Sequence, residues 1–119
     1  MTAACGRKPF TEDGVFEAVG GQQAAPVKGY EQLNAHVKSL DLHAPIHYVT
    51  NVLIEPTTEG AMGAAYLLVV SSLDGNPPAV IRRGVYSDQL VKTAEGWRFE
   101  KRTINWERFP DELSHAWMR

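Results

Sequence analysis

The alternation of apolar and polar side chains is clearest in residues 46–55, which we predict to form a strand. The segment is rich in β-branched and aromatic residues, contains no glycine or proline, and lies between Pro45 and Pro56. These features favour a strand in the middle of a sheet. Because successive side chains of a strand point to opposite faces, the pattern separates two sets of residues. One face is expected to carry His47, Val49, Asn51 and Leu53, and the other Tyr48, Thr50, Val52 and Ile54.

Three more long strands are predicted in the second half of the chain, at residues 61–72, 80–93 and 97–106. The first two are separated by residues 74–78, where Asp, Gly, Asn and two prolines make a loop sequence. The last two are joined by a tight turn at residues 94–96, and two long strands joined in this way predict a β-hairpin.

The first third of the chain predicts a short hairpin and one helix. Residues 1–9 show no periodicity and are expected to form an irregular arm, and residues 10–14 either a helix remnant or a turn. A short strand at residues 15–19 is expected to pair antiparallel with an edge strand at residues 25–28. Residues 30–40 predict a helix, because their apolar side chains recur at helical spacing. These side chains are Tyr30, Leu33, Val37 and Leu40.

This order of elements, one helix followed by a meander of long antiparallel strands, is the plan of an α+β fold. We predict a curved, mainly antiparallel sheet around the helix of residues 30–40. A single domain is expected over residues 1–119. Its last part, residues 110–119, is expected to close the fold with a helical turn that begins at Asp111.

The composition narrows the class of protein. A net charge of −2 over 119 residues offers no electrostatic attraction to nucleic acid or to an anionic membrane, so neither is expected as a partner. No apolar run approaches 18 residues and no signal-peptide pattern is present, which indicates a cytoplasmic protein. The single cysteine, Cys5, excludes an internal disulfide.

Motifs for metals and cofactors are absent from the sequence. There is no glycine-rich phosphate loop, no nucleophile elbow and no helical zinc motif. His43 and His47 have the spacing of zinc ligands on a helix, but Pro45 lies between them and His47 is on a predicted strand. We therefore predict no metal site. His36 and His115 are expected to be surface residues.

His47 and Arg102 are the two candidates for chemistry. His47 is a polar residue on an otherwise mostly aliphatic strand face. It is expected to be either a hydrogen-bonded histidine at the edge of the core or a general base with a pKa near neutrality. Arg102 shares a predicted strand face with Glu100, Ile104 and Trp106. In that position it would either bind an anionic or electron-rich group or stay solvated.

Four segments, taken in order, resemble the SnoaL-like proteins. They are Phe-Thr-Glu-Asp-Gly-Val-Phe at residues 10–16, His-Tyr-Val-Thr-Asn at 47–51, Gly-Val-Tyr-Ser-Asp at 84–88 and Gly-Trp-Arg-Phe-Glu-Lys-Arg at 96–102. These proteins belong to the superfamily that includes scytalone dehydratase, hexachlorocyclohexane dehydrochlorinase and nuclear transport factor two. The resemblance covers about residues 10–108 and implies a cone-shaped α+β barrel.

The resemblance also implies roles for two residues. His47 falls on the catalytic histidine of the dehydratase and dehydrochlorinase branch, which abstracts a proton, and Arg102 falls on its pocket arginine. The implied reaction is an elimination or isomerisation that needs no cofactor. The family's first helix, with the carboxylate that orients the histidine, has no counterpart in residues 1–9. Asp13 falls on a structural position instead, and Glu100 is expected to be the ion-pair partner of Arg102.

Two functions are therefore open. We favour a small-molecule-binding protein whose dehydratase or isomerase site is incomplete and non-catalytic. The alternative is a cofactor-independent lyase or isomerase that acts on a small, largely apolar, cyclic or aromatic substrate with His47 as general base. Besides His47 and Arg102, the residues expected to line the ligand site are Asn51, Tyr66, Tyr86, Ile104 and Trp106.

Assembly is the last expectation. A cone without its covering helix would expose several hundred Å² of apolar surface. The stabilisation lost by leaving that surface in water is roughly 10 kcal/mol. A domain of this size has only about 5–15 kcal/mol of net stability. We therefore expect a homo-oligomer, most simply a dimer, whose partner covers the exposed sheet face. That face carries Tyr66, Leu68 and Val70.

Overall fold

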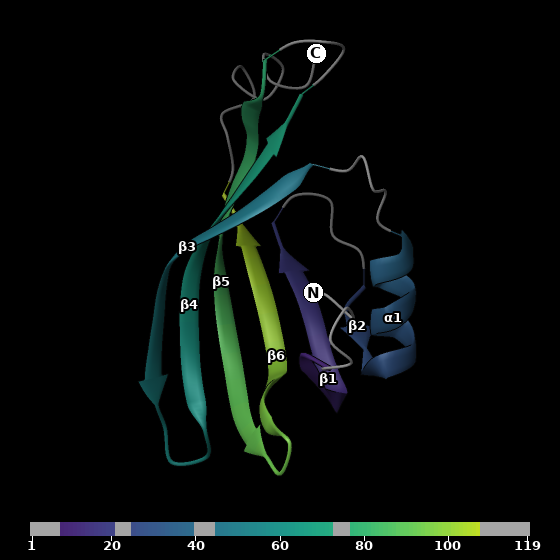
Figure 1. The fold of residues 1–119 in the computed structure, drawn as a ribbon, viewed down its shortest axis with the longest axis vertical. Coiled ribbons are helices and arrows are strands. Elements are labelled where there is room, and N and C mark those ends of the chain that lie inside the picture. The colour runs from purple at the N-terminus through teal and green to yellow at the C-terminus, as the bar shows by residue number, and fades with distance from the viewer. Residues whose placement is uncertain (1–7, 21–24, 40–44, 73–76, 108–119) are drawn as a thin grey trace.

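The computed structural model describes residues 8–20, 25–39, 45–72 and 77–107, which form six strands and one helix (Figure 1). The elements, in chain order, are β1 (Phe10–Val19), β2 (Val27–Lys28), α1 (Gly29–Ser39), β3 (Ile46–Pro56), β4 (Ala61–Ser71), β5 (Ala79–Thr93) and β6 (Gly96–Trp106). The predicted α+β composition is confirmed. The expectations for the N-terminal arm up to residue 7 and for the C-terminal turn at residues 110–119 lie outside the described residues.

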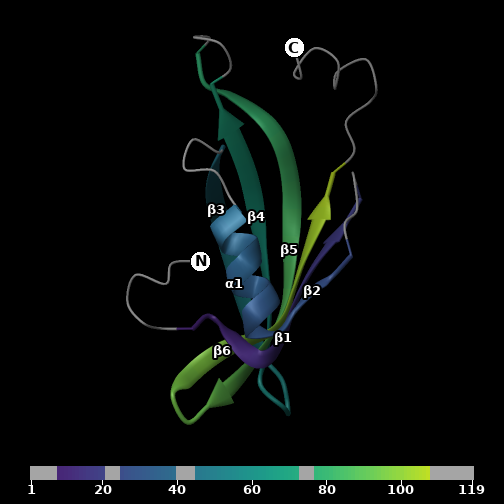
Figure 2. The same ribbon diagram turned by 90° about the vertical axis from the view of Figure 1, so that its right-hand side faces the viewer.

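The six strands form one curved, unclosed sheet in the order β2-β1-β6-β5-β4-β3 (Figures 1 and 2). Neighbouring strands run antiparallel except β1 and β6, which pair in parallel. A parallel pair needs a long connection, and here the connection contains all the other elements. The sheet is thus mainly antiparallel, as predicted, with the first and the last strand of the described chain side by side.

The prediction that residues 46–55 form a central strand is wrong. They form β3, which is an edge strand, and every residue of β3 is exposed. Strand propensity and apolar composition report the fit of side chains to a pleated surface, not the place of the strand in the sheet. This strand therefore leaves apolar side chains on both of its faces open to solvent.

The predicted alternation of faces along this strand also fails after Thr50. A β-bulge lies at Asn51, whose φ of 54° is in the left-handed region that asparagine tolerates. Pairing passes from Thr50 opposite Tyr66 to Leu53 opposite Ala64, so one extra residue is inserted in β3. Leu53 consequently lies on the face opposite to that of His47.

The segment predicted as a helix remnant or turn at residues 10–14 is instead the start of β1. Phe10 pairs with Phe99 of β6, and the two rings are 5.4 Å apart. The register then shifts before Val15, so the strand is irregular where the sequence has Asp13 and Gly14. Phe10 is buried and so holds this irregular stretch against the sheet. The turn-like sequence did not predict this contact.

The core lies on one face of the sheet, which we call the inner face. It consists of a buried cluster with partly buried side chains packed against it. The buried members are Ala65, Leu67, Val69, Tyr86 and Ile104, and the partly buried ones are Phe16, Ala18, Ile81 and Trp106.

The helix α1 covers the β1 end of this inner face. Leu33 is buried, and the ring of His36 lies 5.7 Å from that of Phe16, so His36 is half-buried rather than on the surface as predicted. The first turn is fixed by Gln32, whose Oε1 accepts a hydrogen bond of 3.0 Å from the backbone N–H of Lys28. Within the described residues, no helix has the length and apolar character needed to span a membrane.

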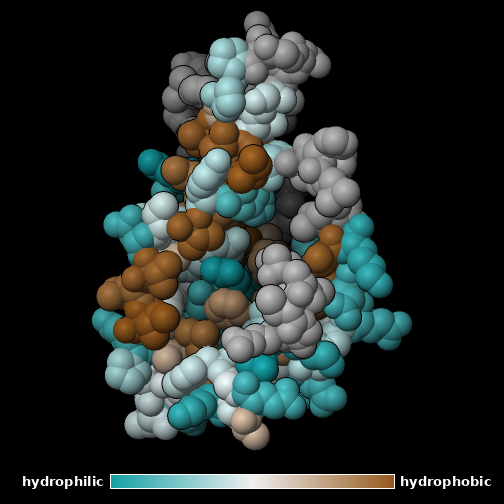
Figure 3. Space-filling model, in the orientation of Figure 1, coloured by the Kyte–Doolittle hydropathy of each residue, from teal (hydrophilic) through white to brown (hydrophobic). Residues whose placement is uncertain are grey.

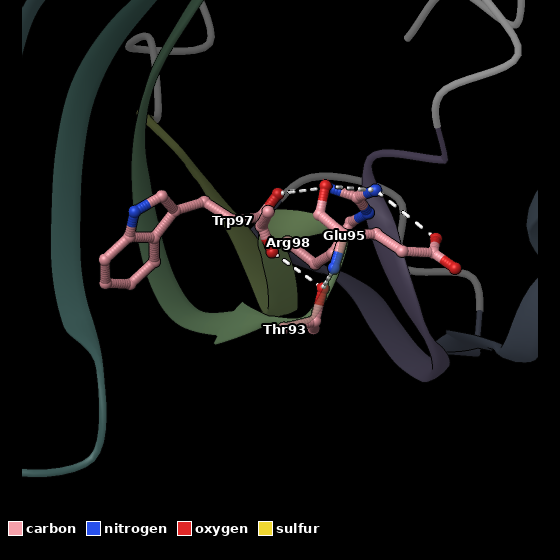
Figure 4. Close-up of polar contacts among 5 residues, drawn as sticks. Thr93, Glu95, Trp97 and Arg98 are labelled. Carbon is pink, nitrogen blue, oxygen red and sulfur yellow. Dashed lines mark hydrogen bonds and ion pairs between the residues drawn. The ribbon is translucent and has the colours of Figure 1, made fainter.

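The predicted hairpin between β5 and β6 is confirmed, and side chains hold its turn (Figure 4). Thr93 Oγ1 donates to the carbonyl of Gly96 at 2.7 Å and accepts from the backbone N–H of Glu95 at 3.2 Å. Arg98 donates to the carbonyl of Trp97 at 2.8 Å and forms an ion pair of 3.7 Å with Glu95. Gly96 has a φ of 121°, a conformation that favours glycine.

Candidate functional site

The register of the strands shows which candidate residues share the inner face. Residues directly opposite one another on neighbouring strands point to the same side of a sheet. His47 and Arg82 are both opposite the buried Val69 of β4, so all three lie on the inner face. Further along the same face, Asp88 is opposite Arg102.

Arg102 and Asp88 form an enclosed ion pair at one end of this face. Arg102 Nε is 3.2 Å from Asp88 Oδ1, and their side chains are only 19% and 8% exposed. The guanidinium also lies over the rings of Tyr86, at 3.5 Å, and Phe99, at 4.7 Å. The contact between Nε and Oδ1 lacks hydrogen-bond geometry, so both buried atoms are without a hydrogen-bond partner.

Burial and the charge of Arg102 have opposite effects on the pKa values of Asp88 and Tyr86. Burial raises the pKa of Asp88 above its ordinary value, and the neighbouring charge of Arg102 partly offsets that rise. Burial likewise raises the pKa of Tyr86, again against the effect of Arg102. Asp88, rather than the predicted Glu100, is the partner of Arg102, because Asp88 is directly across the ladder whereas Glu100 is exposed.

His47 lies at the other end of the inner face, on the exposed edge strand. Partial burial lowers the pKa of its imidazole, and the nearby positive charge of Arg82 lowers it further. No carboxylate in the described part of the chain forms an ion pair with His47. His47 is therefore a neutral, solvent-accessible imidazole near pH 7.

The register separates His47 from Arg102. His47 is directly opposite Val69 of β4. Arg102 is opposite Asp88 of β5, which is in turn opposite Gly63 of β4, six positions from Val69. At about 3.3 Å per residue, this is roughly 20 Å along the strand. The two residues thus share a face but stand at opposite ends of it.

Arg82 is a further basic side chain on the inner face, and it was not among the predicted candidates. Its guanidinium lies 3.8 Å above the ring of Trp106, and its charge lowers the pKa of His47 across Val69. Burial lowers the pKa of Arg82, which nevertheless stays protonated. The signal was present in the sequence: Arg82 is an even number of residues from Tyr86 on one strand, which places both on one face.

Gly84 makes room for the ring of Trp106. The two residues are directly opposite each other, and a Cβ on Gly84 would lie 3.1 Å from Cε3 of Trp106 and 2.8 Å from Cδ1 of Ile104. Only a residue without a side chain permits this close approach of ring and backbone.

The remaining predicted ligand residues fall into two groups. Tyr86 and Ile104 are buried in the core cluster, and Trp106 is half-buried against it. Tyr66 lies on the other face of the sheet, which we call the outer face, and Asn51 is exposed in the bulge of β3. The structure places Trp106 on the same face as His47, in contact with Arg82, and it does not bring Tyr66 to that face.

Within the described residues, no three His, Cys, Asp or Glu side chains are grouped in a way that would hold a metal ion. His43, which the sequence analysis considered with His47, lies outside the described residues.

The fold and a family model agree on the relationship of this chain to known proteins. The model of the SnoaL-like domain matches residues 3–103. The chain belongs to the SnoaL-like family. No curated protein matches it in sequence.

Solved structures share the fold of this SnoaL-like protein. An NTF2-like protein with a cystatin-like fold from Novosphingobium aromaticivorans is 17% identical, with a TM-score of 0.74 over 92% of this chain and 71% of that one. A protein of unknown function from Mycobacterium tuberculosis is 26% identical, with a TM-score of 0.66 over 88% of this chain and 60% of that one. A scytalone dehydratase-like protein from N. aromaticivorans is 19% identical, with a TM-score of 0.65 over 87% and 69% of the two chains.

These matches confirm the predicted curved sheet of the NTF2-like cone fold. The chain spans about three fifths of the length of the M. tuberculosis protein that it matches.

Proposed function

We propose that this SnoaL-like protein binds a small, largely apolar molecule at the His47 end of its inner face, and that it does so without dehydratase chemistry. The observation that carries the proposal is the engagement of Arg102. Its guanidinium is enclosed by Asp88 and by the rings of Tyr86 and Phe99.

An arginine in this position is poorly suited to hold a substrate. The carboxylate of Asp88 balances its charge, and the side chain is mostly buried. Breaking such a pair leaves an uncompensated buried charge, so a ligand that withdrew Arg102 from Asp88 would meet a large cost. These contacts favour a structural role for Arg102, as a link between β5 and β6.

His47 is equally incomplete as a catalyst. A catalytic histidine has its tautomer and orientation fixed by a second group, usually a carboxylate. None forms an ion pair with His47 in the described ranges, and the imidazole is on an exposed edge strand. This supports a binding role for the imidazole over proton abstraction.

The neighbourhood of His47 suits an apolar ligand. Trp106 and Ile81 continue the buried cluster toward this end of the face, and both stay partly exposed. The edge of an indole beside aliphatic side chains offers apolar contact to a small molecule. The SnoaL-like family and the scytalone dehydratase-like relative support a small molecule as the ligand.

Calorimetric titration with a panel of hydroxylated aromatics and cyclic ketones tests this proposal. For a ligand of about twelve heavy atoms we expect a Kd of roughly 10–100 μM. Trp106→Ala should weaken binding at least tenfold, whereas Tyr66→Ala, on the outer face, should leave it unchanged. The proposal fails if no member of the panel binds, or if Tyr66→Ala weakens binding as much as Trp106→Ala.

One observation favours the alternative function, a cofactor-independent lyase or isomerase. The lowered pKa of His47 keeps its imidazole neutral near pH 7, and a neutral imidazole is the form that accepts a proton. If the protein is such an enzyme, the same panel will show turnover, and His47→Ala will abolish it. His36→Ala, on the helix, is the matched control and should retain turnover.

A further inference from the structure

Arg82 differs from the other arginines in the described part of the chain because no carboxylate there pairs with it. The others each have an acidic partner: Arg83 with Glu107, Arg98 with Glu95, and Arg102 with Asp88. Arg82 lies instead over Trp106, at 3.8 Å, on the inner face, where its charge acts on His47 across Val69. A guanidinium that has no counter-ion and is open to solvent is available to pair with an anion.

The stacking on Trp106 presents the guanidinium in a fixed plane. The guanidinium carbon of Arg82 lies 3.8 Å above the centre of the indole ring, and a guanidinium that packs flat on a ring keeps the N–H groups of its edge available to a ligand. This edge is a planar fork of donors, and the group that matches it best is a carboxylate, which accepts two parallel hydrogen bonds. Arg82 is exposed, so a ligand can reach this edge.

The charge near Arg82 favours a single negative charge on the ligand. Arg82 is opposite Val69 of β4, and His47 of β3 lies beyond Val69; the lowered pKa of His47 keeps its imidazole neutral near pH 7. One guanidinium then faces one anionic group, which fits a monoanionic carboxylate better than a phosphate dianion. A neutral imidazole still has one N–H to donate to a ligand oxygen.

We propose that Arg82, stacked on Trp106 and flanked by His47, binds the carboxylate of a small aromatic or alicyclic acid whose apolar part lies against the inner face. This inference rests on the proposed binding function and specifies the ligand class for the same site. It assigns the ligand's polar end to Arg82 rather than to the enclosed Arg102.

The test compares two ligands of nearly equal size that differ in charge, 2-naphthoate and 2-naphthalenemethanol, by calorimetric titration of the full chain. The wild-type protein should bind 2-naphthoate about tenfold more tightly, because a charge-assisted pair adds to the shared apolar contact. Raising the salt concentration should weaken the binding of 2-naphthoate and leave that of 2-naphthalenemethanol nearly unchanged.

Two variants then locate the effect. Arg82→Gln should remove the preference for 2-naphthoate and leave the affinity for 2-naphthalenemethanol within about twofold of wild type. Arg83→Gln is the matched control, because Arg83 is the next residue, points to the other face and pairs with Glu107 through a hydrogen bond of 2.8 Å. It should leave both affinities unchanged.

The outcomes separate this inference from the function on which it rests. If the wild-type protein binds both ligands equally, or if Arg83→Gln abolishes the preference as Arg82→Gln does, the carboxylate site is wrong and the apolar site stands. If neither ligand binds, both proposals are overturned. The comparison of the two ligands on the wild-type protein needs no variant, so a poorly folded Arg82→Gln protein would not prevent a decision.

Discussion

Arg102 and Asp88 face each other across the β5–β6 ladder with Nε and Oδ1 3.2 Å apart, and both side chains are largely withdrawn from solvent. The relationship gives the arginine of this SnoaL-like protein a partner within its own sheet. This ion pair lies at the enclosed end of the inner face. His47, Arg82 and Trp106 lie toward the exposed end. The predictions below follow from this division.

Removing Asp88 should destabilise the protein because it leaves the guanidinium of Arg102 buried without a counter-charge. We expect Asp88→Asn to lower the free energy of unfolding by about 2–4 kcal/mol, measured by denaturant titration. The double variant Asp88→Leu with Arg102→Met should recover most of that loss, since it removes both charges together. Glu95→Gln removes a carboxylate that is 86% exposed and 3.7 Å from Arg98, and it should cost less than about 0.5 kcal/mol. A double variant as unstable as Asp88→Asn would argue against a structural pair.

Gly84 should tolerate no side chain. In Gly84→Ala the new Cβ would lie 2.9 Å from the carbonyl oxygen of Asn105 and 2.8 Å from Cδ1 of Ile104, so the backbone or the Trp106 ring must shift. We expect a loss of about 1–3 kcal/mol in the free energy of unfolding. Gly63→Ala is the control on the neighbouring strand, because its Cβ would meet nothing closer than 3.4 Å. Equal losses in the two variants would contradict the close packing of Trp106 on Gly84.

The titration of His47 should report its distance from Arg82. By nuclear magnetic resonance we expect a pKa below the ordinary 6.5, because burial and then the charge of Arg82 disfavour the imidazolium. Arg82→Gln should raise this pKa part of the way back, and Arg83→Gln should not change it. Because the folded-state pKa is the lower one, the contribution of His47 to stability is lost as pH falls below about 6.5 through the folded value. A pKa above 6.5 would contradict the placement.

The outer face of β3 and β4 should mediate self-association. Four large apolar side chains there are between 51% and 59% exposed, namely Tyr48, Leu53, Met62 and Tyr66. On the side of the molecule that carries the helix, hydrophobic side chains also gather along the β3 edge (Figure 3). We expect light scattering at micromolar concentration to give about twice the 13.2 kDa of one chain. Tyr66→Glu should shift the protein toward monomer, and a wild-type monomer would overturn the expectation.

The sequence predicted the helix and strands better than the order and pairing of the strands in the sheet. The spacing of Tyr30, Leu33 and Val37 was enough to place α1 within a residue or so, and the turn at residues 94–96 was enough to pair β5 with β6. The edge position of β3 was not predictable, because an apolar strand looks the same at the edge of a sheet as in its middle.

The site was harder to predict for a similar reason. The bulge at Asn51 changes the face of every later residue of β3, and a local pattern does not reveal it. The partner of Arg102 is set by the register between β5 and β6, which the sequence does not reveal. Beyond Gln89 that register shifts by one residue. The spacing of residues along β6 indicated Glu100 as the partner. The pairing of β5 with β6 instead places Asp88 opposite Arg102.

The most direct test of the central claim is a map of backbone amide shifts in ¹⁵N-labelled protein titrated with 2-naphthalenemethanol. Binding on the inner face predicts that the largest shifts fall on Val69, Arg82 and Trp106, with only small ones at Met62 and Tyr66 on the outer face. Shifts concentrated on Met62 and Tyr66, or no saturable shifts at millimolar ligand, would contradict the account.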